Sequence, residues 1–377
     1  MQVRYLLLFM LIITFSCKQN TEKSSTITLN NTENTIKYAK VFQLKQYENY
    51  KILTIKNPFQ KGSYSYKYVL RNQDAVLPDS LKNYKQIQVP IQSIIVTSTT
   101  HIPALELLGV EDKLIGFPSC NYISSAKTRV LIDNGKIKEL NNNQALNVET
   151  ILVLKPDVLV AFGINGLSKP LQNLEKMQIP ILVNGDWLEE SALGKAEWIK
   201  FFGALFNKGK QADSIFNTIE KNYNKAKLLA KHTKVKPTVF AGALQGDKWV
   251  LPAGKSWVAQ FLKDANSQYL WADNQEKGSI KLSYENVLIK AATADFWLAP
   301  GFYDSKEKLA ENKHYRQFKA FQTGNIFSFT TKKGTTGGLL YFEVAPQRPD
   351  WVLNDLIHIF HPELLPDYEN HFFEKLP

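Results

Sequence analysis

The sequence predicts an α/β protein: two Rossmann-like lobes, each with a parallel sheet, joined by one long α-helix and preceded by a small N-terminal β extension. From Ser93 onward, short continuous apolar segments alternate with helical segments, which is typical of parallel strands covered on both faces. The alternation gives way to two helical patterns between residues 191 and 234 and then resumes. One pattern occurs twice, as LNVETILVLKPDVLVAF (residues 146–162) and LSYENVLIKAATADFWLAP (residues 282–300). We therefore expect one copy in each lobe.

The chain begins with MQVRYLLLFMLIITFSC, in which an apolar run follows Arg4 and ends in a serine and Cys17. The run is shorter than the roughly 20 apolar residues that span a bilayer, so residues 1–16 are predicted to be a cleaved export signal. A cysteine directly after a small residue resembles a bacterial lipoprotein signal, in which this cysteine carries the lipid. An ordinary secretory signal is the alternative. Residues 17–34 are polar and aperiodic, and they are predicted to be a lipidated tether.

Four further parts are predicted after the tether. Residues 35–92 contain β-branched and aromatic residues in partial alternation and are expected to form the β extension. Residues 93–192 are expected to form the N-terminal lobe, residues 193–234 the helical connector, and residues 235–377 the C-terminal lobe. The apolar pattern predicts strands at residues 93–96, 113–117, 158–162 and 180–184, and helices at residues 148–154, 170–177 and about 209–232.

Composition and motifs exclude several classes of function. The net charge of +11 is not gathered into a basic run with interleaved aromatic residues, so nucleic acid is not an expected partner. Cys120 is the only cysteine besides Cys17, so no disulfide framework is expected. The one close histidine pair, His358 and His361, is interpreted as structural, and no metal site is predicted.

The sequence lacks the motifs of the enzymes that share this alternation. The first predicted strand of the N-terminal lobe is followed by TSTTHIPALELLG, which has no G-x-G-x-x-G turn for a dinucleotide. A G-x-S-x-G nucleophile turn is also absent. We therefore expect no enzyme activity, no catalytic residue and no cofactor, with a Rossmann-type enzyme as a distant alternative.

The repeated pattern places a glutamate at the same position of each copy. Asn147 and Ser283 are good N-caps, so Glu149 and Glu285 should each occupy the second position of a helix. A carboxylate there complements the helix dipole, and this local role is one explanation of the repeat.

The phrase NVETILVLKPDVLVAF, the long connecting helix and the lipoprotein signal together resemble the periplasmic binding proteins of bacterial ABC importers, in the branch that carries iron–siderophore complexes, haem and cobalamin. The resemblance covers about residues 93–366. It implies that Glu149 and Glu285 dock onto arginines of the two permease subunits, one glutamate per lobe. The second copy departs from the pattern, because Ala-Thr-Ala-Asp stands where Pro-Asp is usual. The resemblance further implies a monomer that faces the periplasm, is anchored to a bacterial membrane by lipid, and delivers its solute to a permease dimer.

The solute is expected between the lobes, because ligands of open α/β sheets bind outside the carboxyl ends of the strands. Several aromatic and polar residues follow predicted strands or lie in the glycine-rich segment KKGTTGGLLYFEVAPQRPD, and these are the candidate ligand contacts: His101, Asn121, Tyr122, Trp187, Trp249, Tyr303, Tyr341, Glu343 and Arg348. Arg348, Lys332 and Lys333 favour an anionic ferric chelate. A ferric siderophore is therefore the first expectation, and cobalamin or haem is the alternative.

Overall fold

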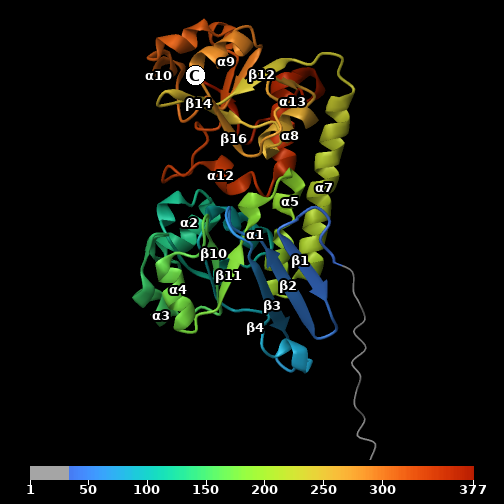
Figure 1. Cartoon of the computed structure of the whole chain (residues 1–377), viewed down its shortest axis with the longest axis vertical. Coiled ribbons are helices and arrows are strands. Elements are labelled where there is room, and N and C mark those ends of the chain that lie inside the picture. The colour runs from blue at the N-terminus through green and yellow to red at the C-terminus, as the bar shows by residue number, and fades with distance from the viewer. Residues whose placement is uncertain (1–33) are drawn as a thin grey trace, which may run out of the picture. The chain divides into compact units, whose positions relative to one another are not determined.

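Two five-stranded sheets, each covered by helices, form the centre of this computed structural model, which describes residues 34–377 (Figure 1). The predicted signal peptide, Cys17 and nearly all of the predicted tether lie outside the described residues. Within the described part of the chain, no helix is both long enough and apolar enough to cross a membrane.

The first sheet is entirely parallel and has the strand order β11-β10-β5-β6-β7. Its central strands are buried on both faces, which is why they read as continuous apolar runs. We call this sheet and the helices on it the N-lobe. Its elements are β5 (Ile94–Val96), α1 (Ile102–Leu107), β6 (Leu114–Phe117), α2 (Ala126–Asp133), β7 (Lys138–Glu139), β8 (Asn141–Asn142), β9 (Ala145–Leu146), α3 (Val148–Leu154), β10 (Val158–Phe162), α4 (Lys169–Lys176) and β11 (Ile181–Asn184). The predicted bounds of α3 and β10 are confirmed.

The second sheet has the order β15-β12-β17-β18-β19, and only its edge strand β19 runs antiparallel. A three-stranded antiparallel sheet, β13-β14-β16, accompanies it. We call this part the C-lobe. Its elements are β12 (Thr238–Ala241), β13 (Ala243–Gln245), β14 (Lys248–Pro252), α8 (Trp257–Asp264), β15 (Gln268–Tyr269), β16 (Ser279–Leu282), α9 (Tyr284–Ala291), β17 (Phe296–Leu298), α10 (Lys306–Ala310), α11 (Lys319–Thr323), β18 (Ile326–Ser328), α12 (Leu340–Val344), α13 (Pro349–Phe360) and β19 (Glu374–Lys375).

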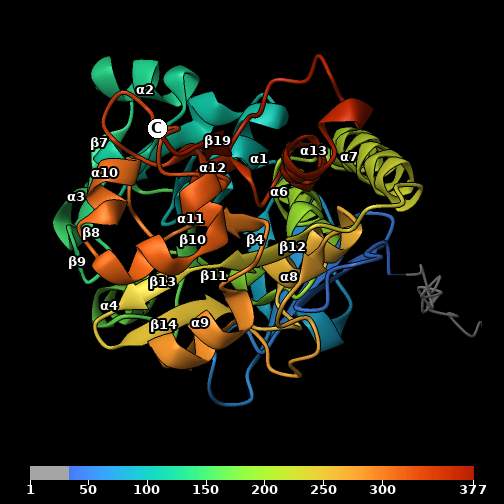
Figure 2. The same ribbon diagram turned by 90° about the horizontal axis from the view of Figure 1, so that it is seen from above.

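A single long helix connects the lobes. The chain leaves the N-lobe through α5 (Ala192–Ala196) and α6 (Ile199–Leu205) and then forms α7 (Gly209–Lys231). The first half of α7 places Phe216 and Ile219 in the N-lobe core, and its second half places Tyr223 and Ala230 in the C-lobe core. Figure 2 shows α7 beside α13, in agreement with their direct contact. One rigid element therefore packs against both cores, as the sequence predicted.

The N-terminal extension is a four-stranded sheet of β1 (Phe42–Gln46), β2 (Tyr50–Lys56), β3 (Ser65–Arg71) and β4 (Lys85–Gln88). It is fastened by two buried carboxylates next to the connector. Glu197 accepts hydrogen bonds from the backbone N–H groups of residues 37–39, at 2.6 to 2.9 Å. Glu189 accepts from those of Lys40 and Val41, at 2.8 and 3.0 Å. The extension is thus part of the N-lobe core, where Phe42 packs on Trp198 with ring centroids 4.5 Å apart.

Candidate functional site

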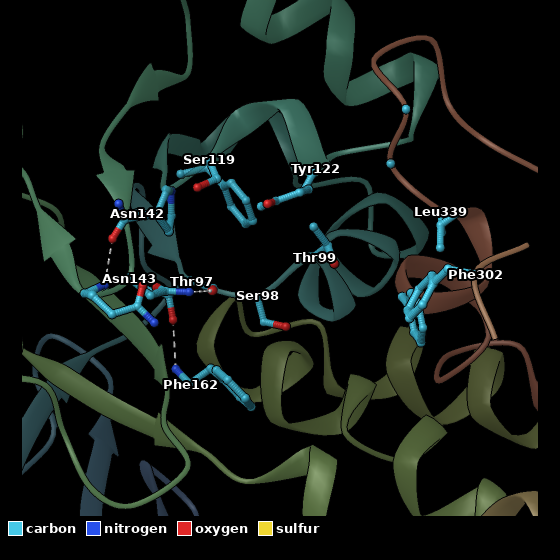
Figure 3. Close-up of a pocket in the computed structure, with 16 residues that line it drawn as sticks. Thr97, Ser98, Thr99, Ser119, Tyr122, Asn142, Asn143, Phe162, Phe302 and Leu339 are labelled. Carbon is cyan, nitrogen blue, oxygen red and sulfur yellow. Dashed lines mark hydrogen bonds between the residues drawn. The ribbon is translucent and has the colours of Figure 1, made fainter. Parts of the chain in front are cut away.

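A cavity of about 670 Å³ lies where the carboxyl ends of the strands in the two lobes meet. Its lining residues follow β5, β6, β10, β17 and β18 in the chain, so it occupies the edge where open α/β sheets bind ligands. The N-lobe contributes Thr97, Ser98, Thr99, Phe117, Pro118, Ser119, Tyr122, Asn142, Asn143, Gln144 and Phe162, and the C-lobe contributes Phe302, Gly337, Gly338, Leu339 and Phe342. Figure 3 shows these residues.

The polar side of the cavity is built by the ends of three strands. The Thr97 hydroxyl accepts a hydrogen bond from the backbone N–H of Phe162 at 2.8 Å, which fixes the end of β10 against the end of β5. Asn143 donates from Nδ2 to the Thr97 carbonyl at 3.0 Å (Figure 3). Asn142 accepts from the backbone N–H groups of Gln144 and Ala145, both at 3.0 Å, which holds the β8–β9 turn in place. Neutral hydroxyl and amide groups are therefore held at fixed positions along one wall.

The other walls carry aromatic rings that the protein leaves uncovered. Tyr122 is 68% exposed, Phe302 is 71% exposed, and Phe342 is 46% exposed. The rings of Phe302 and Phe342 lie 6.3 Å apart, and Phe342 packs edge-on against Phe329 at 5.2 Å. Exposed apolar area gathered in a concave site marks a surface that another molecule covers.

None of the sixteen residues that line the cavity carries a formal charge. The cations that favoured an anionic solute are engaged elsewhere. Arg348 donates to both carboxylate oxygens of Asp350, at 2.9 and 2.7 Å, and its guanidinium lies 3.6 Å from the centre of the Trp351 ring. Lys332 pairs with Glu374 at 2.8 Å, and Lys333 lies 4.0 Å from Asp304. The cavity lining is therefore neutral, and Arg348, whose guanidinium is bonded to Asp350, is not part of it.

Of the sequence-predicted contacts, Tyr122 lines the cavity and three others lie at its margin. Trp187 packs edge-on against Phe162 with centroids 6.0 Å apart, and its buried Nε1 has no partner among the described residues. Asn121 is next to Tyr122, and its carbonyl accepts a hydrogen bond from Thr336 at 2.7 Å. Tyr303 follows Phe302 and packs its ring on Tyr315 at 6.0 Å.

The remaining candidates are buried and do not line the cavity. Trp249 is fully buried in an aromatic cluster, where its Nε1 donates to the Ala241 carbonyl at 3.0 Å. Tyr341 stacks on Phe329 at 4.7 Å, and burial raises the pKa of its hydroxyl. His101 is 1% exposed, both ring nitrogens lack partners among the described residues, and burial lowers its pKa. Glu343 is 1% exposed and bonds to backbone N–H groups of the N-lobe.

Tyr122 is the only one of the nine predicted contacts that lines the cavity. Phe302, Phe342, Phe162 and the residues Asn142 to Gln144 are among the lining residues that were not predicted as contacts. The signal for Phe162 was available, because it is the last residue of a correctly predicted strand. The NNNQ run carried a weaker signal: it lies in a short hairpin whose position beside β5 depends on tertiary contacts.

A second cavity of about 680 Å³ lies between the N-terminal extension and the C-lobe. It is lined by Lys236, which precedes β12, and by Gln268 at the start of β15. It therefore lies at the amino ends of the strands, which is the opposite edge from the one where such sheets bind ligands. Among the described residues, no group of three or more His, Cys, Asp or Glu side chains is arranged to hold a metal ion. His358 contacts Asn370 at 2.8 Å and His361 contacts the Ala265 carbonyl at 3.1 Å.

The two glutamates of the repeat both lie exposed at the second position of a helix. Asn147 caps α3 by accepting from the Thr150 N–H at 3.0 Å, and Ser283 caps α9 by accepting from the Asn286 N–H at 3.3 Å. Hydrogen bonds from its own backbone N–H and from Ser283 lower the pKa of Glu285. Both predicted caps are confirmed, and neither glutamate lines the cavity.

The chain matches a known protein family and resembles several known proteins. Residues 94–332 match the family model described as periplasmic binding protein. A relative from Methanocaldococcus jannaschii, named as an uncharacterized lipoprotein, is 28% identical, with 94% of this chain and 90% of the relative covered. A vitamin B12-binding protein from Vibrio parahaemolyticus is 20% identical over 68% of this chain and 87% of its own length. The crystal structure of a possible iron-binding periplasmic solute-binding protein from Staphylococcus epidermidis superposes with a TM-score of 0.56 at 18% identity, covering 72% of this chain and 99% of that chain.

Proposed function

The chain belongs to the periplasmic binding protein family, and from this premise we propose that it is the receptor of an ABC importer that captures a bulky metal chelate of low net charge in the cavity between its lobes. The observation that carries the proposal is the neutral cavity in which Tyr122, Phe302 and Phe342 stay exposed beside fixed amide and hydroxyl groups. A volume of about 670 Å³ accommodates a ligand of several hundred daltons.

A hydroxamate-type ferric siderophore fits this chemistry better than a catecholate. Three hydroxamates supply three negative charges and cancel those of Fe³⁺, whereas three catecholates supply six and leave a trianion. Burying an uncompensated anion against neutral walls is costly. The amides of Asn142 and Asn143 and the hydroxyl of Thr97 match the amide and hydroxamate oxygens of such a complex.

A corrinoid is the second candidate, and two observations favour it. The uncovered aromatic rings offer flat apolar contact area for a macrocycle. The vitamin B12-binding protein from Vibrio parahaemolyticus is similar to this chain over 68% of its length. Haem carries two propionates, for which the cavity lining offers no cationic partner, so it ranks behind the other two.

The experiment that tests the proposal is a fluorescence titration of the mature protein with three probes: ferrichrome, ferric enterobactin and cyanocobalamin. Trp187 beside Phe162 is a built-in reporter. We expect ferrichrome to quench the tryptophan fluorescence saturably, or cyanocobalamin to do so if the solute is a corrinoid. Ferric enterobactin, the catecholate trianion, should bind at least tenfold more weakly. Tight binding of ferric enterobactin alone would overturn the assignment of a neutral solute.

Delivery to a permease is the second part of the proposal. We infer that Glu149 and Glu285 each contact one subunit of a permease dimer, because they occupy equivalent exposed helix starts in the two lobes. We further infer that Cys17 carries a lipid that holds the protein on the outer side of a bacterial membrane. The lipoprotein relative from Methanocaldococcus jannaschii supports this anchoring. In this role the protein acts as a monomer and binds its solute without chemical change.

A further inference from the structure

A carboxylate from the C-lobe is buried in the N-lobe immediately beside the cavity. Glu343 accepts a hydrogen bond from the backbone N–H of Ser124 at 2.6 Å and another from that of Ser125 at 3.0 Å. More than two hundred residues separate these partners in the sequence. Each carboxylate oxygen accepts a hydrogen bond from one backbone N–H, so Glu343 binds two consecutive peptide units of the other lobe.

The same segment of the N-lobe makes further close contacts with the C-lobe. Thr336 donates its hydroxyl to the Asn121 carbonyl at 2.7 Å. A Cβ atom added to Gly334 would lie 2.6 Å from the Ser124 Cα, and one added to Gly338 would lie 2.4 Å from the Tyr122 carbonyl oxygen. These positions require glycine because the two backbones approach too closely for any side chain. The glycine-rich segment 332–339 and α12 thus dock onto residues 121–125, and Figure 1 shows α12 between the two lobes.

The contact lies at the N-terminus of α2. Ser125 is the N-cap of α2, where its Oγ accepts from the Thr128 N–H at 3.2 Å. Glu106 of α1 accepts from the hydroxyls of Ser125 and Thr128. Two carboxylates, one from each lobe, therefore lie at the positive end of the α2 dipole. A buried carboxylate persists only where such donors surround it, so this contact is specific and is not incidental packing.

The position of the contact relates it to the cavity. Tyr122 lies two residues before Ser124, and Phe342 lies one residue before Glu343, and both Tyr122 and Phe342 line the cavity. We propose that Glu343 is a positioning residue that clasps the lobes together and so sets the separation between the Tyr122 wall and the Phe342 wall. We call the Glu343 hydrogen bonds to Ser124 and Ser125 the lobe clasp. Glu343 determines which solutes fit without touching the solute.

A matched carboxylate in the same region provides the control. Glu139 of the N-lobe accepts from the backbone N–H groups of Ser119 and Cys120, at 2.9 and 2.8 Å. It makes the same two-amide contact as Glu343, but within one lobe. Glu139→Gln should therefore loosen its own loop without changing the relation between the lobes.

The first test measures amide hydrogen exchange in the full mature chain without any ligand. In Glu343→Gln, one carboxylate oxygen is replaced by an NH₂ group that cannot accept, so one amide of the lobe clasp loses its partner. We expect exchange across residues 121–128 to rise about tenfold, as loss of one hydrogen bond to a buried amide implies. In Glu139→Gln, exchange should rise at residues 119–120 and stay unchanged at residues 124–125.

A second pair of variants keeps the test decisive if Glu343→Gln does not fold. Ser125 has φ −60°, which suits proline. Ser125→Pro removes both the hydroxyl and the N–H that Glu343 accepts, whereas Ser125→Ala removes only the hydroxyl. The excess exchange of the proline variant over the alanine variant at Ser124 measures the lobe clasp. Equal exchange in the two would overturn the proposal.

The third measurement rests on the proposed function and uses the probe that wild type binds, ferrichrome or cyanocobalamin. Glu343→Gln should weaken its binding about tenfold. If wild type binds neither probe, the proposed function fails while the exchange results still decide the lobe clasp. If exchange rises in Glu343→Gln but affinity for the bound probe stays at the wild-type value, Glu343 holds the lobes together without setting the cavity.

Discussion

The guanidinium of Arg348 holds the carboxylate of Asp350 with two hydrogen bonds of 2.9 and 2.7 Å, two residues further along the chain. This pair engages one of the three cations that the sequence offered for an anionic solute, and Arg348 does not line the cavity. The Asp350 side chain is only 2% exposed, so it depends on Arg348 for compensation of its charge.

Arg348→Ala should therefore destabilise the fold without weakening solute binding. Removing one partner of a buried ion pair leaves the other charge uncompensated, at a cost of about 3 kcal/mol or more. Thermal unfolding should show the loss, and titration of the folded variant should give wild-type affinity. The double variant Arg348→Met with Asp350→Asn should recover most of the stability. A large loss of affinity at unchanged stability would restore Arg348 as a ligand contact.

Replacing the exposed aromatic rings of the cavity should weaken solute binding without destabilising the fold. Phe302→Ala and Phe342→Ala remove rings that are 71% and 46% exposed, so the free energy of unfolding should change by less than about 1 kcal/mol. Solute affinity should fall about tenfold for each, because the rings are covered only when solute binds. Trp249→Ala is the contrasting variant: this fully buried ring should cost about 3–5 kcal/mol of stability. Unchanged affinity in both phenylalanine variants would place the solute elsewhere.

The two exposed glutamates should matter for transport alone. Glu149→Lys and Glu285→Lys should leave solute affinity unchanged and reduce uptake through the matched permease, with the double variant lower than either single one, because like charges repel across an interface. Glu307→Lys is the control, since Glu307 is also exposed in the first turn of a helix with a serine N-cap. The measurement is uptake of solute per amount of folded protein in each variant. Full uptake by the double variant would show that neither glutamate contacts the permease and that the repeat only provides two capped helices.

The lobe clasp should open as the pH rises. Burial, with a smaller contribution from the Glu106 carboxylate, raises the pKa of Glu343 from 4.5 to about 7, although its two amide partners act in the other direction. His101, which precedes α1 next to α12, has its pKa lowered by burial.

A carboxyl exposed by opening would lose its proton near pH 4.5, whereas the closed form keeps it to about pH 7. Closure therefore takes up a proton. The free energy that this proton contributes to the closed clasp is fully present below pH 4.5 and is lost as the pH rises through 7. Exchange at residues 124–125, corrected for the intrinsic effect of pH, should rise about tenfold or more between pH 5 and 8. Glu343→Gln should show a flat profile. A rise of the same size in that variant would show that another group titrates.

Solute binding should change the size of the molecule very little. The single helix α7 packs into both lobe cores, and the lobe clasp joins the lobes on another side. A rigid connector permits only small closure. Solution scattering of the free and solute-loaded protein should give nearly the same radius of gyration. A change of several ångströms would show that α7 bends or that its contacts with one core break.

The sequence by itself determined the elements of this protein and the order in which they occur. Alternation of buried strands with helices predicted the two parallel sheets, the long amphipathic run predicted α7, and Asn147 and Ser283 predicted two capped helices. These features depend on residues a few positions apart, so local spacing and backbone chemistry are sufficient to specify them. The rule that ligands bind at the carboxyl ends of strands also located the cavity and Tyr122 within it.

Only the tertiary structure decided which side chains reach the cavity. Trp249, Tyr341, Phe302 and Phe342 are all aromatic residues of the C-lobe. Trp249 and Tyr341 are buried in its core, whereas Phe302 and Phe342 are exposed at the cavity. Glu343 finds its partners in Ser124 and Ser125, which no local pattern relates to it. The physical reason is that burial and charge pairing are set by groups far apart in the chain, which meet only when both lobes have folded around α7.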